Sequence, residues 1–273
     1  MNKKINAMFF SATDTTKKIV CTIAQEISEH YSGSSNFKII DFTLPAARET
    51  PVTFTEEDLV VFGVPVYAGR VPNLMVKYIA SVQGRGALAI PVVLYGNRDY
   101  DDALIELRDL LEEGGFKIIA AAAFIGEHAF SKILAKGRPD EKDLALACEF
   151  ARQVGQKLKG RGDIATIDVK GNRPYRKHYM PKNKKGIPVD IRKVKPKTND
   201  NCIDCKLCAR VCPMGSIDFD QVSVVSGVCI KCCACIKKCP TQAKYFDDSD
   251  YLWHKEDLEM KLTARKEPEL FLE

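Results

Sequence analysis

The chain has 273 residues, of which 45% are hydrophobic and 28% are charged, with a formal net charge of +5 and 11 cysteines. This length allows one ordinary domain plus a smaller one. The short apolar run near the N-terminus gives way at once to polar residues, and the longest apolar run, residues 118–126, is far too short to cross a bilayer. The sequence therefore predicts neither a signal peptide nor a membrane span.

Charge is distributed unevenly along the chain. Residues 1–160 hold 19 basic and 20 acidic residues, whereas residues 161–200 hold 12 basic and 4 acidic ones. Residues 201–246 hold 6 basic and 3 acidic residues, and residues 247–273 hold 4 basic and 9 acidic ones. We predict four segments with these boundaries: an α/β domain, a basic extended linker, a small cysteine-rich domain, and an acidic C-terminal helix or tail.

Residues 1–160 alternate apolar strand-like runs with helical patterns, which is typical of a parallel sheet with crossover helices. We predict five strands, at residues 5–10, 37–42, 59–66, 88–95 and 116–125. The last three are nearly continuous in apolar residues, as strands buried on both faces are. We predict helices near residues 15–30, 72–82, 101–113 and 140–159. Five strands in a doubly wound sheet favour the order 2-1-3-4-5, with a ligand beyond strands 1 and 3.

Three loops leave strands 1, 3 and 4 at one edge of this sheet. The first holds Ser11, Ala12, Thr13, Asp14, Thr15 and Thr16. Its hydroxyls, with the N–H groups at a helix start, suit a phosphate, although the same residues are common helix N-caps. The others hold Pro65, Val66, Tyr67, Ala68 and Gly69, and then Gly96, Asn97, Arg98, Asp99 and Tyr100. Each has a tyrosine near a glycine, which suits a flat flavin ring. The absence of G-x-G-x-x-G argues against a dinucleotide site.

Residues 161–200 are rich in Lys, Arg, Gly and Pro and show no long apolar period. Basic residues alternate with aromatic ones at residues 173–179, a pattern that could bind nucleic acid. The favoured interpretation is a solvated segment that lies between the domains or faces an acidic redox partner. His178 has no second histidine or cysteine at metal spacing.

Eight cysteines form two runs of the pattern C-x-x-C-x-x-C-x-x-x-C-P, and the second run repeats the first at an offset of 27 residues. The runs are Cys202, Cys205, Cys208 and Cys212, then Cys229, Cys232, Cys235 and Cys239. Zinc usually takes separated C-x-x-C pairs, and disulfide frameworks belong to secreted chains. Cys233 occupies the place of Lys206 in the first run, so we interpret it as a non-ligand. Cys21 and Cys148 fit buried positions in helices.

The region of residues 201–246 resembles the bacterial ferredoxins that hold two 4Fe-4S clusters, in which the fourth cysteine of each run binds the other cluster. That resemblance implies one cluster on Cys202, Cys205, Cys208 and Cys239. It implies the second on Cys229, Cys232, Cys235 and Cys212. A region of this size buries little apolar surface, and we therefore expect its folding and cluster assembly to be one event. After this region, Ser249 and Asp250 can cap a helix with an apolar face of Leu252, Trp253, Leu258 and Leu262.

Residues 1–160 resemble a short-chain flavodoxin, and residues 3–246 together resemble the flavodoxin-ferredoxin fusion proteins of anaerobic bacteria and archaea. The resemblance implies that residues 11–16 hold the phosphate of FMN, while residues 65–70 and 96–100 lie on either side of its ring. Asp14 stands where flavodoxins usually have glycine. Aspartate tolerates a left-handed backbone, but its charge repels a phosphate.

The resemblance implies an electron-transfer protein in which FMN and two clusters exchange electrons, with redox proteins as partners and a cytoplasmic location in an anaerobe. Two alternatives stay open. One is a flavin-dependent reductase of a small molecule, for which Arg98 and Asp99 are the only candidate acid or base groups in the flavin loops. The other is a flavin-free shell that only docks a ferredoxin to its partner.

Overall fold

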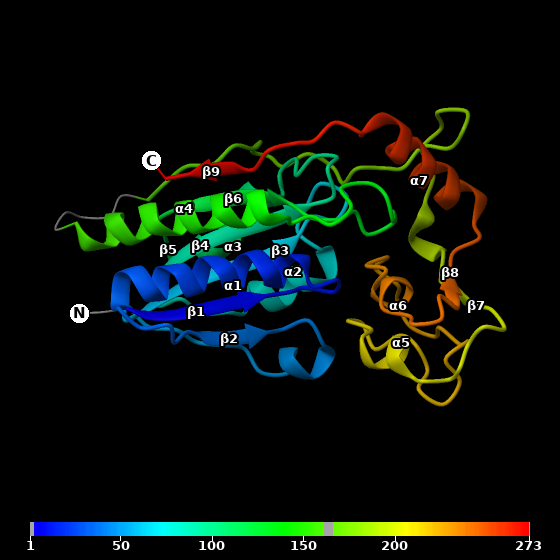
Figure 1. Ribbon diagram of the computed structural model, residues 1–273, viewed down its shortest axis with the longest axis horizontal. Helices are drawn as coiled ribbons and strands as arrows, with labels where there is room; N and C mark the ends of the chain where they lie inside the picture. Colours follow the sequence, from blue (N-terminus) through cyan, green and yellow to red (C-terminus); the bar gives the residue numbers. More distant parts are fainter. Residues whose placement is uncertain (1–2, 161–165, 273) are drawn as a thin grey trace.

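The structure, a computed structural model, describes residues 3–160 and 166–272, so residues 161–165 of the predicted linker lie outside it. Figure 1 shows a layered α/β domain at one end of the molecule and a smaller cysteine-rich region at the other. Two further segments of chain run along one side of the α/β domain and connect the two parts. None of the helices in the described ranges is long and apolar enough to cross a membrane.

The sheet of the α/β domain has the strand order β2-β1-β3-β4-β6-β9, and β5 also pairs with β4. Its strands are β1 (Lys4–Phe9), β2 (Lys38–Asp41), β3 (Asp58–Pro65), β4 (Leu88–Tyr95), β5 (Lys117–Ile118), β6 (Ala121–Ile125) and β9 (Glu269–Phe271). All pairs except β6 with β9 are parallel. The predicted order 2-1-3-4-5 is therefore confirmed. The predicted fifth strand is divided into β5 and β6, which both pair with β4.

Two pairs of helices cover the two faces of the sheet. Helices α1 (Thr15–Ile27) and α4 (Glu141–Lys159) lie on one face, and α2 (Asn73–Ile79) and α3 (Ala103–Glu113) lie on the other. A π-helical turn η1 (Ser28–Ser32) extends α1, and a short 3₁₀ helix η2 (Pro45–Arg48) follows β2. Side chains alternate along each strand, so Phe9 packs under α1 and α4 while Phe10 packs on the opposite side. These helices agree with the predicted ones to within a few residues.

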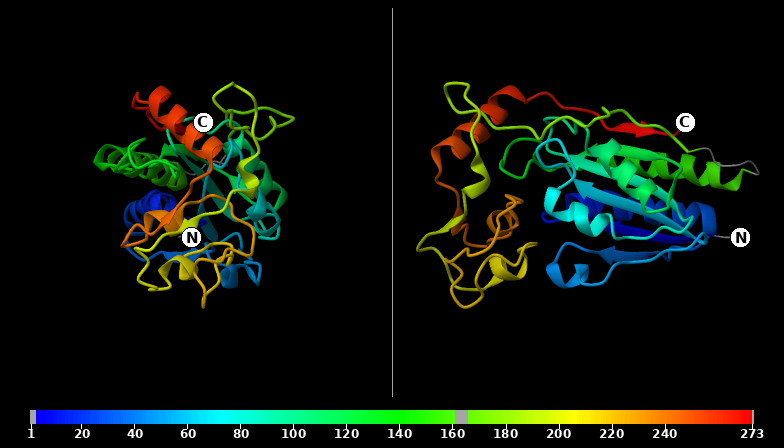
Figure 2. Two further views of the ribbon diagram at one scale, coloured as in Figure 1. Left: turned by 90° about the vertical axis from the view of Figure 1, so that its right-hand side faces the viewer. Right: turned by 180° about the vertical axis from the view of Figure 1, so that it is seen from behind.

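The C-terminal segment forms helix α7 (Ser249–Lys261) and then returns to the α/β domain as β9. Figure 2 shows this return along the edge of the sheet. Asp248 caps α7 by accepting the N–H of Tyr251, so the cap lies one residue before the predicted Ser249 and Asp250. The helix buries Tyr251, His254 and Leu258, of which only Leu258 belonged to the predicted face. Strand β9 was not predicted.

Residues 166–190, which we call the strap, are mostly extended and pack against the α/β domain. Ile167 and Val169 are buried in the hydrophobic cluster beneath α3. The fully buried carboxylate of Asp102 accepts hydrogen bonds from the backbone N–H and the guanidinium of Arg176, at 2.6 and 3.0 Å. Burial opposes that charge, but these hydrogen bonds and those from Asn172 hold the pKa of Asp102 well below its usual range. Part of the basic charge of the strap is therefore used within the chain.

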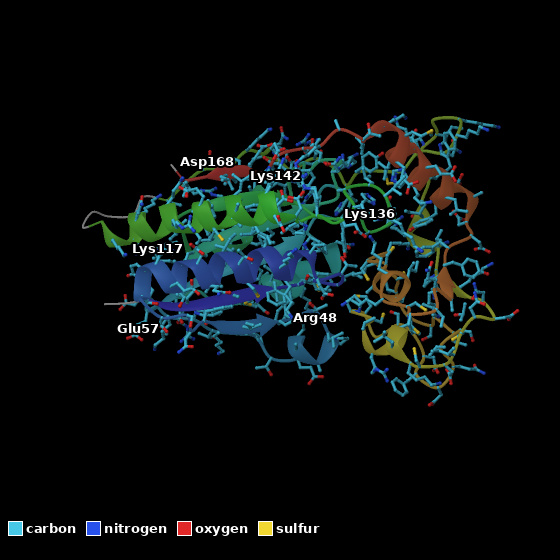
Figure 3. All side chains as sticks on the ribbon, viewed as in Figure 1. Arg48, Glu57, Lys117, Lys136, Lys142 and Asp168 are labelled. Carbon is cyan, nitrogen blue, oxygen red and sulfur yellow. The ribbon has the colours of Figure 1, made fainter. Side chains whose placement is uncertain are left out.

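The cysteine-rich region contains only short elements. They are the 3₁₀ helix η3 (Ile191–Lys193), the strand pair β7 (Lys197–Thr198) and β8 (Lys244–Tyr245), and the one-turn helices α5 (Leu207–Arg210) and α6 (Ala234–Lys237). Cys232 and Ala234 belong to the same hydrophobic cluster as the face of the sheet under α2 and α3. Arg48 of η2, labelled in Figure 3, donates to the carbonyl oxygen of Pro213 at 2.5 Å. The two parts of the molecule thus share an apolar interface.

Strand β9 is connected to the loop after β4 by one buried hydroxyl. The ring of Tyr100 is only 2% exposed, and its hydroxyl donates to Oε2 of Glu269 at 2.7 Å. Replacing Tyr100 with phenylalanine removes this bond and should destabilise the β9 attachment by about 1 kcal/mol. Hydrogen exchange of the β9 amides should become about fivefold faster. Tyr245→Phe, in β8, serves as the control, and unchanged exchange in Tyr100→Phe would refute the proposed role of this hydroxyl.

Candidate functional site

The duplication of the cysteine run extends to the backbone. Positive φ angles occur at Asp204 and Lys231, again at Lys206 and Cys233, and again at Gly215 and Gln242. Each pair is separated by the 27 residues that separate the two runs. The one-turn helix α5 starts directly after Lys206, and α6 starts directly after Cys233. The two runs therefore fold in the same way.

The fourth cysteine of each run is held by the same contact. The sulfur of Cys212 accepts the N–H of Ser216 at 3.4 Å, and that of Cys239 accepts the N–H of Ala243 at 3.2 Å. Backbone N–H groups that point at sulfur stabilise thiolates and tune cluster potentials.

A cavity in this region is lined by the cysteine set predicted for the second cluster. Cys229, Cys232 and Cys235 come from the second run, and Cys212 comes from the first. The remaining wall is mainly apolar, with Ile217, Val225 and Ile230 among its residues. No three His, Cys, Asp or Glu side chains in the described ranges converge closely enough to hold a single metal ion. Cys212, Cys229, Cys232 and Cys235 border the cavity in which the predicted second cluster would lie.

Burial raises the pKa of the Cys229, Cys232 and Cys235 thiols. Without iron these thiols would stay protonated at neutral pH, so cluster binding displaces their protons and is coupled to folding. The ligand set remains a prediction, and the crossing of Cys212 into the second run supports it.

The other cysteines occupy different surroundings. Cys202 and Cys208 pack around Ile217 and Val222, while Cys205 is exposed. Cys233 also borders the cavity, but its buried sulfur lies 3.6 Å from the hydroxyl of Tyr251 and packs against Phe246. The surroundings of Cys233 are consistent with the predicted non-ligand role. Cys21 and Cys148 are half-buried on α1 and α4.

A second cavity, of about 490 Å³, lies at the edge of the sheet where the predicted flavin loops meet. This volume is within the range of ordinary cofactor sites. Of the predicted residues, the cavity is lined by Ala12, Thr13, Thr15, Thr16, Pro65, Val66, Tyr67, Ala68, Gly69, Gly96, Arg98 and Asp99. Ser11, Asp14, Asn97 and Tyr100 do not line it.

The loop after β1 has the shape of an anion site. Asp14 adopts the left-handed conformation, with φ 67°, as predicted for an aspartate at a glycine position. The buried hydroxyl of Ser11 accepts the N–H of Lys17 at 3.0 Å, so it supports the loop from outside the cavity. The first N–H groups of α1 have no partner within a helix, and Thr13, Thr15 and Thr16 place hydroxyls beside them. This donor set fits a phosphate.

The loop after β3 forms a tight hairpin that supports Tyr67. Ala68 and Gly69 both have positive φ, and Tyr67 and Arg70 exchange backbone hydrogen bonds of 2.9 and 3.1 Å. Arg70 binds both carboxylate oxygens of Glu106 at 2.7 Å, which fixes the hairpin to α3. Burial, with a smaller effect from the nearby cysteines, raises the pKa of Tyr67 well above its usual value. Tyr67 therefore lies close to the second cysteine run as a protonated phenol.

The loop after β4 differs from the prediction. Tyr100 lies outside the cavity, because its ring is buried against Tyr95 and its hydroxyl binds Glu269. Asn97 is also buried, and its amide donates to the carbonyl oxygens of Leu262 and Ala264 at 2.8 and 2.9 Å. These two residues therefore hold the C-terminal segment instead of facing a ligand. Arg98 lines the cavity and pairs with Asp101.

Sequence reasoning missed several residues of the cavity. His128 follows β6, Tyr179 comes from the strap and His254 from α7. Nδ1 of His128 accepts the N–H of Phe130 at 3.1 Å, and burial, helped by Lys237, lowers the pKa of His128 to about 3. The imidazole is therefore neutral, with its proton on Nε2. Nothing in the local sequence marked these residues, although Tyr179 lies in the basic and aromatic run noted above.

Tyr179 lines the cavity that the prediction expected Tyr100 to line. Its N–H donates to the carbonyl oxygen of Ala68 at 2.8 Å, so the strap is attached to the Tyr67 hairpin. The guanidinium of Arg98 lies over the Tyr179 ring, 4.4 Å from its centroid. Tyr67 and Tyr179 thus line the cavity from adjoining segments, and Tyr95 of β4 lines it as well.

Cys229, Ile230 and Lys231 of the second cysteine run also line this cavity. The predicted flavin loops and the second cysteine run therefore border one space. By contrast, exposed Cys205 and exposed Ile203 of the first run do not border it.

The crossed ligand sets predict which cysteine variants should resemble each other. Removing any ligand of one cluster should reduce the iron content from about eight to about four per chain and leave the same residual spectrum. Cys212→Ala should therefore match Cys232→Ala, and Cys239→Ala should match Cys205→Ala, by iron analysis and by electron paramagnetic resonance of the reduced protein. Cys233→Ala should keep about eight iron atoms. If Cys212→Ala instead matched Cys205→Ala, the crossed assignment would be wrong.

Residues 195–248 match a family model described as a 4Fe-4S dicluster domain. Among solved structures, a flavodoxin of Streptococcus pneumonia TIGR4 is 15% identical and covers 56% of this chain and 97% of its own, with a TM-score of 0.38. A short-chain flavodoxin associated with a non-canonical PDU bacterial microcompartment is 14% identical. The match covers 55% of this chain and 95% of that flavodoxin, with a TM-score of 0.37.

The azoreductase AzrA is also 14% identical and covers 56% and 99%, with a TM-score of 0.31. No curated protein matches the chain. The fold assignment of residues 3–160 rests on the strand order of the sheet, and that of the cysteine-rich region on the family match. The chain thus joins a flavodoxin-like domain to a 4Fe-4S dicluster domain, the arrangement of flavodoxin-ferredoxin fusion proteins.

Proposed function

We propose that this chain binds FMN in the cavity between its two domains and transfers electrons between that flavin and two 4Fe-4S clusters. The iron-sulfur domain and the flavodoxin-like fold already indicate electron transfer. The observation that supports the specific proposal is the shared wall, since Thr13 and Tyr67 line the same cavity as Cys229 and Lys231.

The residues of the cavity have separate roles in this proposal. The start of α1, with Thr13, Thr15 and Thr16, would hold the phosphate. Tyr67 and Tyr179 would face the ring, and Arg98 would keep Tyr179 in place. FMN would supply two-electron and one-electron exchange, while each cluster carries single electrons.

The placement of the cysteines supports an order of the two clusters along the proposed electron path. The cluster on Cys229, Cys232, Cys235 and Cys212 would be proximal, because its ligand loop borders the flavin cavity. The cluster on Cys202, Cys205, Cys208 and Cys239 would be distal and would exchange electrons with partner proteins, because Cys205 is exposed.

Flavin titrations of the cluster-loaded, deflavinated chain test this proposal. Tyr67→Ala removes an aromatic contact worth about 0.5–1.5 kcal/mol, so both FMN and riboflavin should bind several-fold more weakly. Thr13→Ala should weaken FMN but spare riboflavin, which lacks the phosphate. Tyr100→Phe is the control and should bind both flavins like the unaltered chain. If no variant altered flavin affinity, or if the unaltered chain bound no FMN, the flavin site would be refuted.

A further inference from the structure

Two carboxylates flank the predicted phosphate site. Asp14 lies within the loop after β1, and its side chain is largely exposed. Glu127 follows β6 and lines the cavity itself. The two loops are close, because a Cβ added to Gly126 would lie 3.1 Å from Oγ1 of Thr15. A phosphate dianion bound at the start of α1 would meet both negative charges.

Both carboxylates are paired with lysines from the dicluster domain. Nζ of Lys238 lies 2.9 Å from Oδ2 of Asp14 and 3.2 Å from Oδ1. Nζ of Lys237 binds Oε1 of Glu127 and also donates to the carbonyl oxygen of Ser131 at 2.9 Å. Two consecutive lysines thus neutralise the two acidic groups beside the phosphate loop, which has no lysine of its own between residues 11 and 16.

The lysines at the start of α1, in the α/β domain itself, do not neutralise these two carboxylates. Lys17 and Lys18 of α1 are exposed and do not line the cavity, and Lys18 donates to the carbonyl oxygen of Pro139. Separated from the dicluster domain, the phosphate loop would keep its donors but would hold them beside two unpaired carboxylates. The screening length is about 10 Å at 0.1 M salt, so charges on neighbouring loops are only partly screened from one another.

The two lysines also directly precede a predicted cluster ligand. Lys237 is the last residue of α6, and Lys238 is followed by Cys239. Because the dicluster domain is too small to fold on apolar burial alone, cluster assembly is expected to order this segment. The position of both positive charges then depends on the clusters.

We propose that Lys237 and Lys238 complete the phosphate end of the flavin site by neutralising Glu127 and Asp14, so that FMN binds tightly only once the dicluster domain is assembled. This inference rests on the proposed FMN site and adds an order of loading, with clusters before flavin. Because binding linkage is reciprocal, bound FMN also stabilises the docked dicluster domain.

The test is a double-mutant cycle read by flavin fluorescence, with anaerobic, cluster-loaded, deflavinated protein. Lys238→Met should weaken FMN several-fold, because Asp14 is left unpaired, and Lys238→Arg should retain the affinity of the unaltered chain. Asp14→Asn combined with Lys238→Met should restore that affinity. Riboflavin affinity should stay constant in every variant. Chelating the iron should weaken FMN more than riboflavin.

The matched control is Lys197→Met. Lys197 pairs with Asp247 at 2.6 Å within the dicluster domain, away from the phosphate loop, so this variant should bind FMN normally. Iron content near eight per chain shows that each variant has assembled its clusters. The inference is overturned if FMN affinity is unchanged in Lys238→Met, or if FMN and riboflavin weaken equally. A chain that binds no FMN without any substitution would refute the proposed function instead.

Discussion

Attachment of the dicluster domain at both of its ends is the constraint on which the rest of the structure depends. On the N-terminal side, Arg176 of the strap binds the fully buried carboxylate of Asp102. On the C-terminal side, Asn97 holds the chain after α7, and β9 then joins the sheet beside β6. A domain of this size cannot bury much surface by itself, so these two attachments and the apolar interface fix its place against the flavin loops.

The segments that attach the dicluster domain also build the cavity. Tyr179 of the strap and His254 of α7 line it, and the strap is hydrogen-bonded to the hairpin that carries Tyr67. A flavodoxin-like domain alone would leave this edge of the sheet open. In this chain, the strap and α7, which both follow α4 in the sequence, cover the same edge. The predicted flavin loops and the second cysteine run therefore border a shared, partly enclosed space.

Local sequence patterns predicted the strands, the helices and the cysteine runs. Contacts between residues far apart in the sequence decided which side chains line the flavin cavity. The apolar runs predicted the sheet order, and the resemblance to ferredoxins implied the group of Cys212, Cys229, Cys232 and Cys235 that lines one cavity. The sequence places Tyr100 at the flavin because it lies near Gly96 in a loop at the same edge of the sheet as the other two flavin loops. Its actual position depends on Glu269, which returns from 169 residues away in an unpredicted strand. The ion pair between Asp14 and Lys238, which are 224 residues apart, could not be predicted from the sequence either.

The central claim, that flavin and clusters exchange electrons within one chain across the shared cavity, is tested most directly by the concentration dependence of that exchange. The clusters of the FMN-loaded protein would be reduced anaerobically by a light-driven one-electron donor, and flavin reduction would be followed by its absorbance. We expect a first-order rate constant that is the same at every protein concentration, because the transfer is intramolecular. A rate constant that rises in proportion to protein concentration would show transfer between chains and would contradict the account.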